Sequence, residues 1–127
     1  MARFLTDLKV ELVSDTAAEG RGLWRLTDQL VYLSDLPGVP PIVVPPGFVT
    51  DFASVPRVPI AFLLCGDTAS KPAALHDFLY TKPHEAVPDR ATADAIFREA
   101  AKAEGVPAWR CFMLWAGVRL GGASHWD

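Results

Sequence analysis

The amino-acid sequence predicts an α+β fold in which a small antiparallel β-sheet comes first and three helices follow. In the first fifty residues, short apolar segments alternate with polar residues at a period of two, as half-buried strands do. Seven prolines between residues 36 and 59 exclude a regular helix from that stretch. After residue 70, apolar residues recur at helical spacing, between the proline and glycine residues that begin and end helices.

The strands are expected over residues 8–13, 22–26, 30–33 and 42–44. Residues 27–29 (TDQ) separate the second strand from the third and resemble a hairpin turn. The proline-rich loop follows and carries residues 50–54 (TDFAS). Proline restricts the backbone there, so we expect these polar residues to lie on a stiff loop.

Three helices are expected in the second half, over residues 73–80, 90–104 and 108–120. Pro72, Asp89 and Pro107 precede them, while glycines at 105, 121 and 122 provide the left-handed residues that end helices. The last helix carries an aromatic stripe and is predicted to be the central core helix. Trp115→Ala is therefore expected to cost roughly 3 to 5 kcal/mol. The stripe consists of Trp109, Phe112, Trp115 and Ala116.

Chain length and composition predict one domain over residues 1–127, mainly β over 1–50 and mainly α over 70–121. With 127 residues and a mass of 13.8 kDa, the chain has the usual size of one domain. Half of its residues are hydrophobic and 21% are charged, which is the balance of a packed globular protein rather than a disordered one.

Charge and hydropathy argue against nucleic-acid and membrane partners. The net charge of -3 leaves no basic surplus to neutralise phosphates. The longest apolar run, residues 111–118, is far shorter than the roughly 20 residues that cross a bilayer. Charged residues interrupt the first twelve positions, so a signal peptide is not expected and the protein should stay in the cytoplasm where it is made.

The polar residues that could carry chemistry lie in residues 50–54 and in residues 76–80 (HDFLY). His76 and Asp77 are adjacent on a helix whose other residues are mostly apolar, so at least one of them is expected to be partly buried. A buried ionisable side chain needs a partner. Asp94 lies at the edge of the apolar face of the next helix and needs one as well. We therefore expect Asp51, His76, Asp77 and Asp94 to converge.

One interpretation of these residues is catalytic, with Asp51, Ser54, His76, Asp77 and Asp94 as the candidate site. In its metal form, His76, Asp77 and Asp94 would ligate a divalent cation whose bound water becomes a nucleophile. The sequence contains no HExxH motif that would strengthen this interpretation, and Ser54 is not in a GxSxG elbow.

The other interpretation is structural and requires no cofactor. His76 would donate a hydrogen bond to a backbone carbonyl or to Asp94, and Asp77 would accept backbone hydrogen bonds from the proline-rich loop. Arg90 could pair with Asp94, four residues further along the same helix. The sequence leaves both interpretations open.

Three blocks of the sequence resemble a known family. Residues 47–57 (GFVTDFASVPR), residues 74–80 (ALHDFLY), and Arg90 with residues 93–97 (ADAIF) occur in this order. They are similar to the blocks of an uncharacterised phage and prophage family, domain of unknown function 1353. The resemblance extends from about Gly47 to Gly121, and the strands before Leu36 carry no specific motif.

The resemblance implies a context, because such proteins are typically encoded in tailed phages, prophages and related particles. It implies no mechanism. The polar positions of the family correspond here to Asp51, Ser54, His76, Asp77, Tyr80, Arg90 and Asp94.

The function expected from the residues and the resemblance is a structural or accessory role in a tailed phage or related particle. The alternatives are a metal-assisted hydrolase with an Asp/His site and a module that binds a host component. The expected partners are other particle proteins. The expected location is the host cytoplasm, with assembly into the virion.

Overall fold

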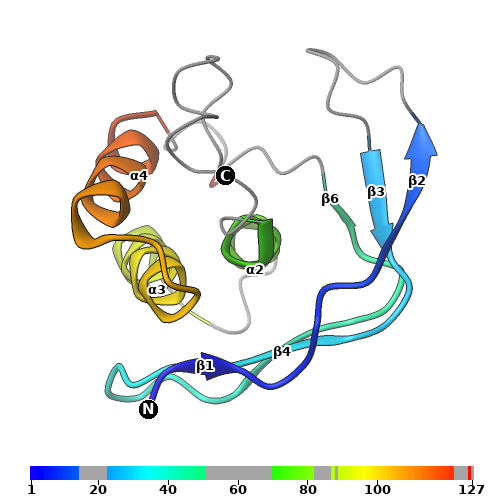
Figure 1. The fold of residues 1–127 in the computed structure, drawn as a ribbon, viewed down its shortest axis with the longest axis horizontal. Coiled ribbons are helices and arrows are strands. Elements are labelled where there is room, and N and C mark those ends of the chain that lie inside the picture. Colours follow the sequence, from blue (N-terminus) through cyan, green and yellow to red (C-terminus); the bar gives the residue numbers. More distant parts are fainter. Residues whose placement is uncertain (15–22, 51–69, 82–86, 88, 122–125, 127) are drawn as a thin grey trace.

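The computed structural model describes residues 1–14, 23–50, 70–81, 87, 89–121 and 126. The strands come first in the chain and the helices follow, which confirms the predicted α+β class. Figure 1 shows helix α2 (Ser70–Tyr80) in the middle, with the strands on one side of it and helices α3 (Arg90–Ala103) and α4 (Ala108–Gly121) on the other.

In the described part of the chain, six short strands form two antiparallel three-stranded sheets, one with the order β1-β4-β5 and the other with the order β2-β3-β6. Consecutive strands along the chain occupy equivalent positions in the two sheets. The strands therefore form three long segments of chain, β1–β2, β3–β4 and β5–β6, which lie side by side. Each segment bends where it continues from one sheet into the other. Their bounds are Arg3–Phe4 (β1), Val10–Ser14 (β2), Leu23–Leu26 (β3), Leu30–Leu33 (β4), Ile42–Val44 (β5) and Val49–Thr50 (β6).

The hairpin turn predicted at residues 27–29 is wrong. Strand β3 pairs with β2 and β6, whereas β4 pairs with β1 and β5, so the chain continues from one sheet into the other at this point. The Thr27 backbone N–H donates to the Lys9 carbonyl at 2.9 Å. This hydrogen bond links the β3–β4 segment to the β1–β2 segment instead of closing a turn. Polar residues between two strands mark a bend as readily as a hairpin.

The β5–β6 segment also bends between its two strands. Gly47 has a φ of 90°, a left-handed conformation that glycine adopts without steric cost. Its N–H donates to the Leu26 carbonyl at 2.7 Å, and the Leu26 N–H donates to the Phe48 carbonyl at 2.9 Å. The bend lets the strands curve around α2, as Figure 1 shows. Residues 50–54 were predicted to form a loop, but Thr50 ends β6 and is buried, while residues 51–54 lie outside the described part of the chain.

The three predicted helices are confirmed, with α2 beginning at Ser70 instead of Ala73. Helix α2 is apolar on nearly every side and packs between the strands and α3, which explains its lack of a polar face. Asp89 occupies the N-cap of α3 with an extended backbone, although its side chain makes no capping hydrogen bond. Gly105, with a φ of 91°, follows the end of α3, as expected for a helix stop.

The prediction that α4 is the central core helix through its aromatic stripe is wrong. The buried residues of α4 are Cys111, Leu114 and Val118, whereas Trp109 and Phe112 are about half exposed. Trp115 is only partly buried. Phe97 of α3 is completely buried instead, in a cluster with Ala73, Ala101, Val106, Cys111, Leu114 and Val118.

Candidate functional site

The carboxylate of Asp94 is the centre of the polar site and is completely buried. Asp94 lies in the second turn of α3, on a face that also buries Ala93 and Phe97. Its Oδ1 contacts two side chains of α2: Nε2 of His76 at 2.7 Å and the hydroxyl of Tyr80 at 2.5 Å. His76 and Tyr80 are four residues apart and share one face of their helix. The site thus joins α2 to α3.

The second oxygen of Asp94 accepts hydrogen bonds from two guanidinium groups. Nη1 of Arg119, near the end of α4, lies 2.9 Å from Oδ2, and Nη1 of Arg90, one turn earlier in α3, lies 3.5 Å from it. Arg90 also donates to the carbonyls of Val118 and Arg119 at 3.1 and 3.3 Å. A cation at the C-terminal end of a helix stabilises the unpaired carbonyls there. Arg90 and Arg119 therefore fasten the end of α4 to the same carboxylate.

These contacts use the whole hydrogen-bonding capacity of the carboxylate. An ionised carboxylate accepts at about four lone-pair positions and donates at none. Two donors approach each oxygen of Asp94, one each from His76, Tyr80, Arg90 and Arg119. Because a carboxylate cannot donate, Nε2 of His76 must carry the hydrogen in this contact.

The hydrogen bonds keep Asp94 ionised in spite of its burial. Burial alone would raise the pKa of the carboxyl group, but hydrogen bonds from His76 and Tyr80, together with the Arg119 contact, lower it below the usual value. The pKa of the Tyr80 hydroxyl is raised to about 12, first by burial and then by its hydrogen bond to Asp94. At neutral pH the site therefore pairs a carboxylate with a neutral phenol.

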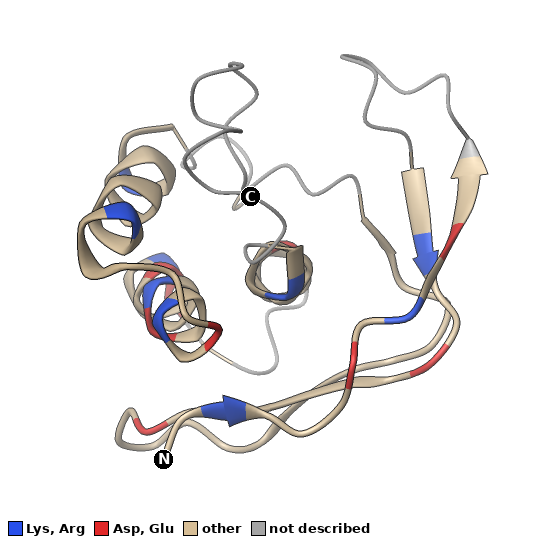
Figure 2. Ribbon diagram, in the orientation of Figure 1, with Lys and Arg blue, Asp and Glu red and all other residues tan. Residues whose placement is uncertain are grey.

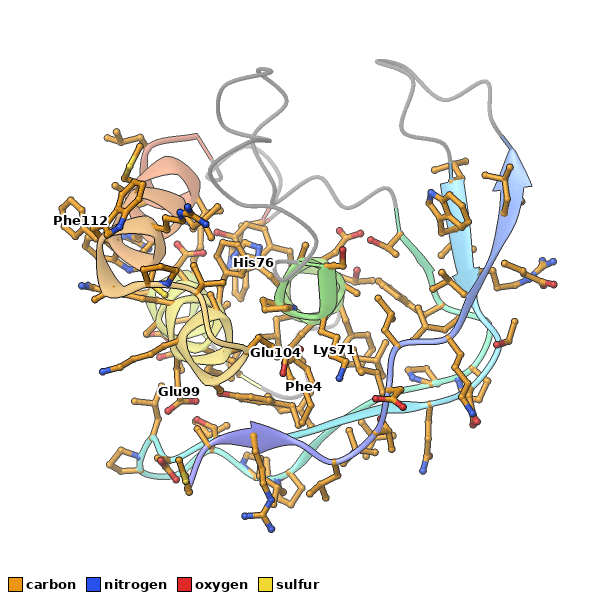
Figure 3. The ribbon with its side chains drawn as sticks, in the orientation of Figure 1. Phe4, Lys71, His76, Glu99, Glu104 and Phe112 are labelled. Atoms are coloured by element: carbon orange, nitrogen blue, oxygen red, sulfur yellow. The ribbon has the colours of Figure 1, made fainter. Side chains whose placement is uncertain are left out.

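Aromatic rings enclose His76. The centroid of its ring lies 4.3 Å from that of Tyr80 and 4.7 Å from that of Phe97. The Tyr80 and Trp126 rings in turn make a T-shaped contact, with their centroids 5.2 Å apart. Only 3% of His76 is exposed. Figure 3 places His76 between α2 and the helices α3 and α4, inside the protein.

The expected contact between His76 and Asp94 is confirmed, as is the Arg90–Asp94 pair. Asp77 lies on the next face of α2 and is partly exposed. Asp51 and Ser54 lie outside the described residues, so the convergence of all four candidate residues stays a prediction. Within the described ranges, no three His, Cys, Asp or Glu side chains form a group that could hold a metal, so His76, Asp77 and Asp94 form no such group there.

Sequence reasoning missed the role of Arg119. The available signal was its position as the last cation of an otherwise apolar helix, which suggests a buried acidic partner. It also missed Glu99, on α3. Glu99 accepts hydrogen bonds from the Tyr32 hydroxyl at 2.7 Å and the Ser34 hydroxyl at 2.8 Å, so it ties α3 to the strands. Nothing in the spacing of Tyr32 and Glu99, 67 residues apart, indicates this contact.

These features define an α+β domain in which three helices converge on one buried, fully hydrogen-bonded carboxylate. The sequence pattern of a family described as a protein of unknown function (DUF1353) matches residues 24–118, about three quarters of the chain. The chain belongs to this family. The match begins at Trp24, well before the Gly47 expected from the motifs, so it includes most of the strands.

No curated protein and no solved structure matches the chain. Among the helices in the described part of the chain, none has both the length and the apolar character needed to cross a membrane.

Proposed function

We propose that this chain is a structural or accessory component of a tailed phage or related particle, and that the Asp94 site holds its helices together. The observation that carries the proposal is the saturation of Asp94. Four donors from α2, α3 and α4 use both of its oxygens, which leaves no free lone pair for a water or a substrate. A site of this kind stabilises an arrangement of helices.

The surroundings of His76 support the same conclusion. A general base needs a ring nitrogen within reach of a substrate proton. The Nε2 of His76 is engaged by Asp94, and its ring is packed between Tyr80 and Phe97 with almost no exposed surface. The phage context of this proposal rests on the resemblance of residues 47–57 and 74–80 to the motifs of a phage and prophage family.

The location of the protein tests this proposal directly. Particles produced by the encoding phage or prophage are purified through a density gradient, and their proteins are identified by mass spectrometry. We expect the chain to be present at a fixed ratio to the major particle proteins. Its absence from particles and from assembly intermediates, together with its presence in the host cytoplasm, would refute the structural role.

A second experiment separates this proposal from the metal-assisted hydrolase. Because Asp94 is saturated by protein donors, the purified chain is expected to contain no stoichiometric zinc, manganese or nickel, and its Tm should not respond to a chelator. His76→Ala should lower the Tm equally with and without added metal, since it leaves a donor-deficient Asp94 instead of removing a metal ligand. Stoichiometric metal, with a chelator-sensitive Tm that His76→Ala abolishes, would favour the hydrolase.

A further inference from the structure

Helix α4 has a second apolar face that the protein does not cover. Its buried face consists of Cys111, Leu114 and Val118. At 100° per residue, Trp109, Met113 and Leu120 lie on the opposite side of the helix, with Phe112 beside them. These four side chains, named here the outer face of α4, are between 50% and 89% exposed. Figure 3 shows Phe112 at the outer edge of the molecule.

An apolar helix of this kind is usually buried all round. Isolated exposed apolar residues are common on protein surfaces, but a continuous stripe indicates a contact with another molecule. From Trp109 to Leu120, the outer face extends about 17 Å along the helix axis, or roughly three turns. That length matches one helix of a partner laid along α4.

The charged residues of α4 are all positive, because the helix contains two arginines, Arg110 and Arg119, and no aspartate or glutamate. Arg110 lies over the Trp109 ring, 5.1 Å from its centroid. On the other flank, Arg98 of α3 lies 5.4 Å from the centroid of Phe112 and 5.3 Å from that of Trp115. Figure 2 shows α4 with basic residues and no acidic ones.

The acidic residues Glu99 of α3 and Glu104 at its C-cap are engaged elsewhere and do not neutralise these cations. Glu99 binds Tyr32 and Ser34 on the strand side of the helix, and Glu104 pairs with Lys71 at 3.6 Å. Nε of Arg110 is buried and has no hydrogen-bond partner, so this guanidinium has unused donor capacity. Among the residues that the structure describes, the flanks of the outer face therefore present cations without compensating acids.

We propose that the outer face of α4 binds an amphipathic helix of a partner protein, with an apolar stripe flanked by aspartate and glutamate. The apolar stripe would cover Phe112 and Met113, and the acidic flanks would pair with Arg98 and Arg110. This inference rests on the proposed assembly role and names the kind of partner that the role requires.

Two other occupants fit the charges less well. A second copy of the chain, paired through α4, would place basic flanks against basic flanks, because α4 supplies no acid. An anionic membrane would attract the flanks of α4, but the chain as a whole carries a net charge of -3 and would be repelled.

The test uses the full chain as bait for a displayed library of 18-residue helical peptides with a fixed leucine stripe and randomised flanking positions. We expect selection to enrich aspartate and glutamate at the flanks. Binding of a selected peptide should weaken at least about tenfold with Phe112→Ala, and again with Arg98→Glu combined with Arg110→Glu. Raised salt should weaken it too, because the flanking contacts are exposed.

Matched controls lie on the strand side of the molecule. Leu12 on β2 is 50% exposed, like Phe112, and Arg3 on β1 is an exposed cation. Leu12→Ala and Arg3→Glu should leave peptide binding unchanged. Thermal melts establish that each variant is folded, and Phe112→Ala keeps the test decisive if the double arginine variant does not fold.

Three results would overturn the inference: enrichment of neutral or basic flanks, full binding by Phe112→Ala, or no peptide enrichment at all. Binding to phosphatidylserine vesicles in place of peptides would assign the face to a membrane. A dimer in sedimentation that Phe112→Ala dissociates would assign it to a second copy.

The outcome is separable from that of the assembly role. If Phe112→Ala enters particles normally, the assembly role stands and the α4 contact fails. If the chain is absent from particles yet selects acidic peptides, the assembly role fails and the α4 contact stands.

Discussion

Asp94→Asn is expected to lower the free energy of unfolding by about 3 to 5 kcal/mol at neutral pH, which is the range for removing one partner of a buried ion pair. The amide removes the negative charge that Arg90 and Arg119 face and places an N–H₂ group opposite donors. The first effect leaves the two guanidinium groups without their counter-ion, and the second leaves donors without an acceptor, which costs more than the lost hydrogen bonds themselves. Urea melts of the two proteins measure the difference.

Asp28→Asn is the control for this change. Asp28 pairs with Lys9 at 3.8 Å, but both side chains are about 60% exposed, so water screens the pair and little stability should be lost. An equal loss at Asp28 and Asp94 would contradict the central role of the buried carboxylate.

The stability difference at Asp94 should also depend on pH in one direction. The pKa of Asp94 is lowered in the folded protein, so its contribution is fully present above the unfolded value of about 3.9 and is lost as pH falls through the lower folded value. The gap between the wild-type protein and Asp94→Asn should stay constant from about pH 7 to pH 5 and narrow below about pH 4. A gap that widens in acid would contradict this assignment.

Phe97→Ala is expected to cost about 3 to 5 kcal/mol, the range for truncating a large buried aromatic residue. Phe97 is completely buried, and its ring packs against that of His76. Its removal would leave a cavity between the three helices and take away one wall of the Asp94 site. Urea denaturation at neutral pH measures the loss.

Phe112→Ala and Trp115→Ala provide the comparison for this prediction. Phe112 is half exposed, so its truncation should cost less than about 1 kcal/mol, and the partly buried Trp115 should fall between Phe112 and Phe97. A cost for Phe112→Ala that equals the cost for Phe97→Ala would mean that the outer face of α4 is part of the core.

The sequence predicted the elements of the fold better than their pairing. Period-two and helical patterns located most strands and all three helices, because these patterns follow from local geometry. The partners of β3 and β4 depend on contacts between residues far apart in the sequence, so residues 27–29 could not be distinguished from a turn. Helix α4 was misjudged for a related reason: an apolar residue indicates burial, but does not say whether its own chain or another molecule buries it.

The candidate site was predictable where a local rule applied. A buried acid needs partners, and this rule indicated both the His76–Asp94 contact and the Arg90–Asp94 pair within α3. It did not identify Arg119, because many exposed arginines in other proteins occupy the last turn of a helix. Asp94 is therefore the residue about which the sequence was most informative.

The shared carboxylate makes several residues dependent on one another. Each donor to Asp94 is valuable only while the acid is there, and the acid tolerates burial only while its donors are there. The free energy of unfolding lost on removing His76 should therefore differ between the wild-type protein and a variant that already lacks Arg119. During sequence divergence, we expect His76, Asp94 and Arg119 to be retained together or replaced together. A single substitution at this site should therefore be rarer than a coupled substitution of two or more of these residues.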